Sequence, residues 1–154
     1  MDIRRAKIKD LEEVVVLSCK SAIYHEELAS YYDIDKNAKH ILSVSLKKNI
    51  YSLNSSIFVA EENGNIIGYL LACKVNRLDM FKIKKAGLIA DVFVEEKDRR
   101  KGVGGELVKE CLKWFKKNDI YFIEISVEAL NKKAINFWNK KGFKDVFIGK
   151  YKKI

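Results

Sequence analysis

The pattern of apolar and polar positions in the first half of the chain predicts a strand, two helices and a hairpin. Residues 2–6 have the pattern of a short strand. Apolar residues recur at helical spacing after Asp10, which can cap that helix, and again over residues 37–51. Residues 55–61 and 66–75 are strand-like and flank Asn63-Gly64, a dipeptide typical of a tight hairpin turn.

The second half alternates strand and helix patterns. Residues 86–94 are almost continuously apolar apart from Asp91 and predict a central strand, and residues 104–117 carry an apolar helical stripe. Residues 121–128 alternate like a strand, residues 132–141 predict a helix that ends at Gly142, and residues 143–151 predict a final strand. This order indicates an α/β (α+β) sandwich around a mixed sheet, in a single domain of residues 1–154.

Charge and cysteine content narrow the classes of function. The chain has 30 Lys+Arg against 21 Asp+Glu, a net charge of +9, which favours an anionic partner or simply gives a soluble surface. The lysines are dispersed and no nucleic-acid motif occurs, so we expect no nucleic-acid partner. Without an apolar run of membrane length or a signal peptide, we expect a cytoplasmic protein with no membrane association. The spacing of the cysteines and histidines predicts no metal site.

A glycine-rich loop is the main candidate for chemistry. Residues 99–105, Arg-Arg-Lys-Gly-Val-Gly-Gly, follow the central strand and open the next helix. Glycines without a Cβ let the backbone approach a ligand, and unpaired N–H groups at a helix N-terminus favour phosphate. The loop fits neither the P-loop pattern nor the dinucleotide fingerprint, because Leu107 stands where the third glycine of that fingerprint belongs.

Two segments resemble one known family. Arg99-x-x-Gly102-x-Gly104 resembles the acetyl-CoA-binding motif of the GCN5-related N-acetyltransferase (GNAT) superfamily. Residues 131–143, Asn-Lys-Lys-Ala-Ile-Asn-Phe-Trp-Asn-Lys-Lys-Gly-Phe, resemble that family's N-x-x-A-x-x-F-Y-x-x-x-G-F segment. The resemblance implies a mixed, mostly antiparallel sheet of about six or seven strands flanked by about four helices. It also implies acetyl-CoA as cosubstrate, no metal, and a homodimer, since the family is often dimeric.

The resemblance further implies where the cosubstrate binds. The pyrophosphate would rest on backbone N–H groups of Arg99, Arg100, Lys101, Gly102, Val103, Gly104 and Gly105. The pantetheine arm would pair with Val92, Phe93 and Val94, and the amide of Val92 or of Phe93 would stabilise the oxyanion. Asn131 matches an asparagine that contacts the cosubstrate, and further contacts would come from Ala134, Phe137, Trp138 and Lys140.

An amine acceptor must lose a proton before it attacks, and three acidic residues are candidates for the base. Asp91 interrupts an apolar strand beside the expected thioester and could act as the base or hold the substrate cation; alternatively, backbone donors or a lysine hold it. Glu124 and Glu128 are better explained as solvated or ion-paired. Residues 89–94, Ile-Ala-Asp-Val-Phe-Val, resemble the L-E-D-F-F-V strand of diamine and polyamine acetyltransferases, but Ala90 replaces the acidic residue.

Trp138 departs from the family pattern, which has a tyrosine there to protonate the leaving thiolate. An indole N–H donates a hydrogen bond but does not release its proton near neutral pH. Trp138 would then hydrogen-bond the thiolate or pack against the cosubstrate. We expect an N-acetyltransferase that moves the acetyl group of acetyl-CoA to a primary amine of a small amine, polyamine or protein. A catalytically impaired acyl-CoA-binding module is the alternative.

Overall fold

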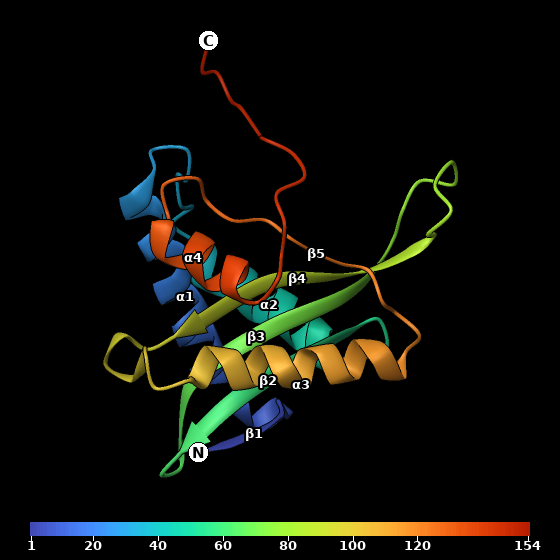
Figure 1. Ribbon diagram of the computed structural model, residues 1–154. Coiled ribbons are helices and arrows are strands. Elements are labelled where there is room, and N and C mark those ends of the chain that lie inside the picture. The colour runs from blue at the N-terminus through green and yellow to red at the C-terminus, as the bar shows by residue number, and fades with distance from the viewer.

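The computed structural model describes residues 1–154 and contains one five-stranded sheet with the order β1-β2-β3-β4-β5. The strands are β1 (Asp2–Arg5), β2 (Ser55–Glu62), β3 (Asn65–Asn76), β4 (Lys85–Val94) and β5 (Ile123–Ile125). The first four are antiparallel neighbours, and β5 runs parallel to β4. The long β3 and β4 cross the centre of the molecule (Figure 1).

Helices cover both faces of the sheet. Helices α1 (Leu11–Leu28) and α2 (Ala38–Tyr51) pack on one face, and α3 (Val103–Lys117) and α4 (Lys132–Lys140) lie on the other (Figure 1). Short 3-10 turns, η1 (Ile8–Asp10) and η2 (Glu96–Asp98), precede α1 and α3. Each layer has its own apolar cluster: Val14, Leu17, Tyr69 and Phe93 belong to the α1–α2 side, and Leu70, Leu107, Phe115 and Trp138 to the α3–α4 side. No helix has the length and apolar character needed to cross a bilayer.

Local sequence signals explain several boundaries. Asn63 and Gly64 adopt positive φ angles of 53° and 80° and join β2 to β3, as expected for this hairpin turn. Asp10 occupies the N-cap position of α1, but its side chain makes no capping hydrogen bond. Its carboxylate accepts hydrogen bonds from Arg4 and from the backbone N–H of Lys7, which ties β1 to the start of α1.

The end of the chain differs from the sequence-based expectation. The sheet has five strands rather than six or seven, because residues 143–151 form no strand. The strand expected over residues 121–128 is paired only over Ile123–Ile125, so it provides a short edge for a further strand. The final segment extends away from α4, and Val146, Phe147 and Ile148 are 86%, 76% and 85% exposed (Figure 1).

An irregularity in β4 creates the opening at which the candidate site lies. Leu71 faces Asp91 across the β3–β4 ladder, whereas Ala72 faces Ile89, so Ala90 is the extra residue of a β-bulge. Strand β5 pairs only with Gly87, Leu88 and Ile89 of β4. Beyond the bulge, the edge of β4 that faces away from β3 is therefore open.

Candidate functional site

The open edge of β4 presents backbone groups of alternate residues. The N–H of Glu95 donates to the carbonyl of Ile67 at 2.9 Å and so points toward β3. Successive residues of a strand direct their N–H groups to opposite edges, so the amide of Phe93 also points toward β3 and that of Val92 toward the opening. Arg99 Nε donates to the carbonyl of Val94 at 3.0 Å, as expected for a carbonyl on the open edge. Of the two amides that the sequence left open, that of Val92 points to the open edge, where it also interacts with the Asp91 carboxylate.

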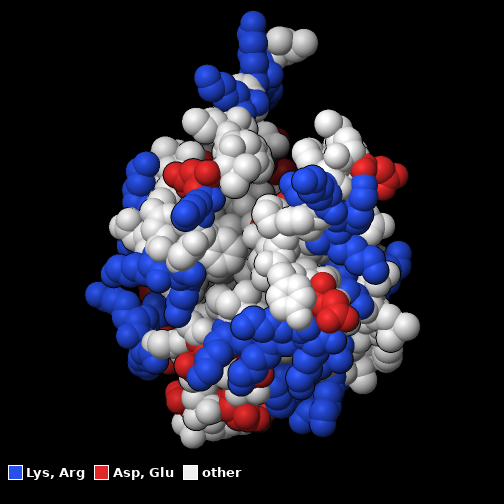
Figure 2. All heavy atoms as spheres, turned by 45° about the vertical axis from the view of Figure 1, so that its right-hand side comes forward, with Lys and Arg blue, Asp and Glu red and all other residues white.

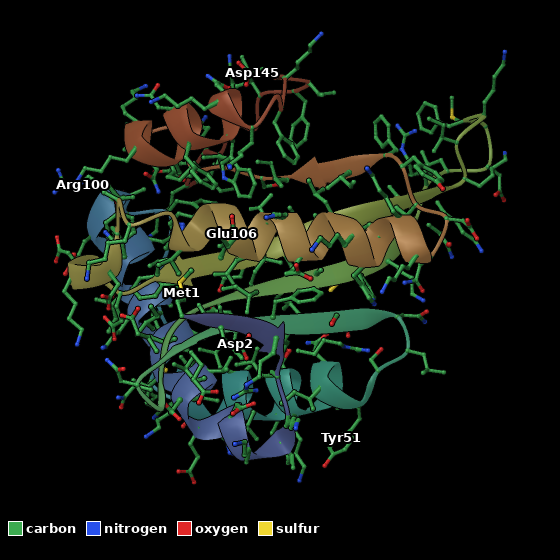
Figure 3. All side chains as sticks on the ribbon, turned by 60° about the horizontal axis from the view of Figure 1, so that its bottom comes forward. Met1, Asp2, Tyr51, Arg100, Glu106 and Asp145 are labelled. Carbon is green, nitrogen blue, oxygen red and sulfur yellow. The ribbon has the colours of Figure 1, made fainter.

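The glycine loop lies next to this edge and presents unpaired donors. No backbone N–H of residues 100–105 donates a hydrogen bond within the chain, and the first bond of this turn joins the Glu106 N–H to the Gly102 carbonyl at 3.1 Å. Gly102 has φ 87° and Arg100 has φ 64°, which turn the chain into α3. Figure 3 shows Arg100 on the loop before α3, with Glu106 further along that helix. The unpaired N–H groups and the helix dipole favour an anion here.

Several basic side chains surround the loop, and some are engaged within the protein. The guanidinium of Arg99 lies 5.3 Å from the ring centres of Tyr24 and Phe93. Lys101 Nζ forms an ion pair with Asp98 at 2.8 Å, which raises the pKa of Lys101. Lys141 lies closer to the helix start, because a Cβ built on Gly105 would be 3.1 Å from its Nζ.

Asp91 lies on the α1 side of β4 and is held by two hydroxyl groups. Ser21 Oγ donates to its Oδ1 at 3.1 Å, and the hydroxyl of Tyr69 donates to Oδ2. Burial raises the pKa of Asp91 above its usual value, against the opposing effects of these hydrogen bonds and the charge of His25. Tyr69 is completely buried, and burial together with the Asp91 charge raises the pKa of its phenol. The site therefore contains a carboxylate in a restricted environment beside the bulge.

The side chains beyond Asp91 come from α1 and from the connection between α1 and α2. His25 lies one turn after Ser21, and its Nδ1 is 2.8 Å from the Ser21 carbonyl oxygen. Its ring is flanked by Tyr24 and Tyr32, whose ring centres are 5.9 and 5.5 Å away. Tyr31 packs against Tyr32 at 5.1 Å. These partly exposed rings form an aromatic group around His25, and Tyr24 also contacts Arg99 of the glycine loop.

Comparison with known proteins identifies this arrangement. The model of the acetyltransferase (GNAT) family matches residues 20–143 of the chain. The chain belongs to the GNAT acetyltransferase family. Its opened β4 edge, glycine loop and α3 N-terminus are therefore those of a GNAT protein.

Sequence relatives support the same assignment. The chain is 27% identical over 143 residues to an uncharacterized N-acetyltransferase of Methanocaldococcus jannaschii, covering 93% of this chain but only 60% of that protein. It is 26% identical to an N-alpha-acetyltransferase of Sulfurisphaera tokodaii, covering 95% of this chain and 81% of that protein.

Solved structures have the same fold. A mutant of a Bacillus halodurans protein superposes with a TM-score of 0.89 at 22% identity, covering 100% of this chain and 99% of that one. A predicted acetyltransferase from Clostridium acetobutylicum, solved with acetyl-CoA, has a TM-score of 0.79 at 18% identity, covering 97% and 95% of the two chains.

The second GNAT segment forms α4 and packs beside the opening. Asn131 caps α4, because its Oδ1 accepts from the Ala134 N–H at 3.0 Å. Phe137 faces the glycine loop, since a Cβ on Gly104 would be 3.6 Å from its ring. Lys140 is exposed. Trp138 is 5% exposed and lies edge-on to Phe137 and Phe143 at 5.0 Å; its Nε1 has no partner in the chain and is not fully buried.

The two other candidate bases interact with groups other than Asp91. Glu124 forms an ion pair with Arg77 at 3.2 Å, in agreement with the ion-paired role expected from the sequence. Glu128 lies beside Tyr32, where its hydrogen bond and charge, together with burial, raise the pKa of that phenol. No group of three or more His, Cys, Asp or Glu side chains is arranged to hold a metal ion.

Sequence reasoning did not single out Ser21 or Tyr69, the two residues whose hydroxyl groups hold Asp91. Ser18, Ser21 and His25 continue the inner face of α1 after Val14 and Leu17, so polar residues at helical spacing marked a change from core to site. Tyr69 stands within an apolar strand, where a buried phenol needs a hydrogen-bond partner. Both signals indicate a polar pocket, but neither identifies Asp91 as the residue that these side chains contact.

Proposed function

We propose that this protein transfers the acetyl group of acetyl-CoA to a primary amine by direct attack. The observation that carries the proposal is the open, bulged edge of β4, which adjoins a loop of unpaired N–H groups on one side and Asp91 on the other. The open edge and the loop suit an extended thioester with phosphates at its far end, whereas Asp91 suits an amine.

The residues present suit coenzyme A. Backbone N–H groups of residues 100–105 can take the pyrophosphate, and Val92 and Val94 can pair with the pantetheine arm. A surface hollow of about 260 Å³ beside α3 is lined by Lys109, Lys113, Lys116 and Lys141, among others, and would favour the remaining phosphate. Asn131, Ala134, Phe137, Trp138 and Lys140 would border the cosubstrate on the α4 side.

The chain's own groups support each step of transfer. The amine nitrogen forms a bond to the thioester carbonyl carbon, the carbon–sulfur bond breaks, and coenzyme A leaves as a thiolate. The Val92 N–H would stabilise the charge on the carbonyl oxygen, a contribution of about 3–4 kcal/mol in other acyl transfers. Asp91 would attract the acceptor cation or take its proton. The Trp138 Nε1, which is not fully buried, would hydrogen-bond the departing sulfur.

Binding without transfer is the alternative function, and the tryptophan at position 138 is the feature that favours it. A thiol with a pKa of about 8.5 leaves without full protonation, which favours transfer even with an indole at this position. Trp138→Tyr separates the two functions: a protein that binds coenzyme A tightly, releases no thiol, and is not activated by this substitution is a binding module.

Thiol release from acetyl-CoA with a panel of amines tests the proposal. Polyamines, amino acids, aminoglycosides and peptide N-termini cover the main acceptor classes. We expect turnover with at least one class, and a fall in kcat/KM of about tenfold or more in Asp91→Asn with unchanged coenzyme A affinity. Asp145→Asn is the matched control, because Asp145 is exposed on the final segment (Figure 3). No turnover on the whole panel would contradict amine acetylation.

We further propose that residues 1–154 act as one N-acetyltransferase domain in the cytoplasm and form a homodimer. The three free cysteines suit a reducing compartment. The unpaired edge of β5 and the exposed Val146, Phe147 and Ile148 supply surface for a second copy. Sedimentation of the full chain, compared with a variant that carries Phe147→Lys, tests the dimer: the substitution should shift the protein toward the monomer.

A further inference from the structure

The ring of His25 is fixed by a backbone contact that determines which nitrogen carries hydrogen. Its Nδ1 lies 2.8 Å from the carbonyl oxygen of Ser21. A carbonyl oxygen only accepts, so Nδ1 must be the donor. The neutral imidazole then carries its lone pair on Nε2. The side chain of His25 is half-buried, so its ring is partly accessible to solvent.

Ser21 connects this imidazole to Asp91. Its Oγ donates to Asp91 Oδ1 at 3.1 Å while its backbone carbonyl accepts from His25. Ser21 and His25 are four residues apart on α1 and therefore share the face that packs toward β4. The other Asp91 oxygen accepts from Tyr69. Asp91 thus accepts hydrogen bonds on both carboxylate oxygens, and its negative charge interacts with His25.

We infer that His25 is the base that takes the proton from the acceptor amine, while Asp91 stays ionised and its negative charge stabilises the resulting imidazolium. The inference rests on the proposed function and assigns to His25 the role of base that was left open for Asp91. A proton of the acceptor ammonium passes to Nε2, and the freed nitrogen electron pair forms the bond to the acetyl carbon; the second proton lost by this nitrogen passes to the departing thiolate. The carbon–sulfur pair leaves with coenzyme A, and His25 later releases its proton to solvent.

The surroundings of His25 suit this role. Tyr24 and Tyr32 flank the ring, Arg99 lies over Tyr24 at 5.3 Å, and Glu128 lies beside Tyr32. Residues 21–35 contain no lysine or arginine, whereas the chain as a whole has 30 of them. An imidazolium therefore faces carboxylates and aromatic rings, with Arg99 as the one cation in this group of contacts.

His25→Asn tests the assignment with little change of shape. An asparagine NH₂ can still donate to the Ser21 carbonyl, but it offers no basic nitrogen. We expect kcat to fall about 100-fold with KM for acetyl-CoA unchanged, which is the range of a lost general base. His40→Asn is the matched control, because His40 is exposed on α2. In His25→Ala, added imidazole should restore part of kcat, which a merely structural role would not allow.

The outcomes separate this inference from the function on which it rests. Turnover by the wild type with unchanged kcat in His25→Asn overturns the base assignment alone. No turnover by the wild type on the amine panel overturns both. Nitrogen chemical shifts of the His40→Asn protein, which retains a single histidine, give a readout independent of activity: hydrogen on Nδ1 supports the inference, and hydrogen on Nε2 overturns it.

Discussion

At the scale of single residues, the Asp91–Tyr69 pair combines a costly burial with compensating hydrogen bonds. Tyr69 is fully buried and belongs to the apolar cluster of the α1–α2 side, yet its hydroxyl reaches a carboxylate. A buried charge without such donors would be protonated or excluded. The hydroxyls of Tyr69 and Ser21 therefore allow an acidic side chain to remain in this layer, next to the bulge.

Asp91 should make the stability of the protein depend on pH. Because its pKa is raised in the folded state, the folded chain holds this proton more tightly than the unfolded chain. The contribution of Asp91 to the free energy of unfolding therefore increases as the pH falls from the raised folded pKa toward the unfolded value, and it is lost as the pH rises. Urea denaturation of wild type and Asp91→Asn at several pH values from 7 down to about 4, the usual pKa of a free aspartate, measures this: acidification should favour the wild type. A constant difference between the two proteins would contradict the raised pKa.

Gly104→Ala should separate binding from folding. A Cβ at this position would lie 3.6 and 3.7 Å from the Phe137 ring and 3.9 Å from Val94, which are ordinary contacts. Alanine also favours a helix over glycine by up to about 1 kcal/mol, so stability should be unchanged or increased. The added methyl would narrow the gap between α4 and the end of β4, and we expect coenzyme A affinity to fall about tenfold. Calorimetric titration measures it, with Gly149→Ala on the exposed final segment as control.

At the scale of elements, α3 lies unusually close to β4 at one point. A Cβ built on Gly87 would be 2.5 Å from Cε1 of Phe115, a side chain with no exposed surface. Gly87→Ala should therefore push α3 away from the sheet and lower the free energy of unfolding by about 1–3 kcal/mol. Phe115→Leu in the same chain should recover part of that loss. Chemical denaturation of the single and double variants gives the comparison, and additive losses would contradict a direct clash.

Local sequence patterns predicted most helices and strands, whereas contacts between residues far apart in the sequence were harder to predict. The Asn63-Gly64 turn and the apolar stripe of α3 each depend on neighbours in sequence, and both were found where expected. Residues 143–151 carry a strand pattern, but a strand also needs a partner, and β5 offers only three paired residues. Similarly, the sequence predicted Asp91 and the glycine loop as candidate site residues. The contact of Asp91 with Ser21, 70 positions away, depends on how α1 crosses the sheet.

At the scale of the whole molecule, charge is unevenly distributed around the site. On the face shown in Figure 2, many lysine and arginine side chains and a few acidic ones surround an uncharged, hollowed region. Basic residues adjoin the glycine loop and line the hollow beside α3, whereas the stretch from Ser21 to Asp35 has none. This separation would attract a polyanion to one end of the opening and an amine to the other.

Salt should therefore weaken the binding of coenzyme A. Screening lengths shorten as ionic strength rises, so the affinity should fall several-fold between low and high potassium chloride. Pantetheine, which lacks the phosphates, should show little change and serves as the matched ligand. Calorimetric titration of coenzyme A and of pantetheine at several salt concentrations measures this difference in salt dependence. Equal salt dependence of the two ligands would mean that the basic residues do not act on the phosphates.

The exposed final segment also affects how the protein survives a protease. Lys144, Lys150, Lys152 and Lys153 lie on a stretch outside all helices and strands, so trypsin can bind the backbone there without unfolding anything. Brief digestion should trim the chain after α4 and leave the sheet and its covering helices intact. A homodimer that buries this segment would delay the trimming as the protein concentration rises, so cleavage rates would report the association of two copies.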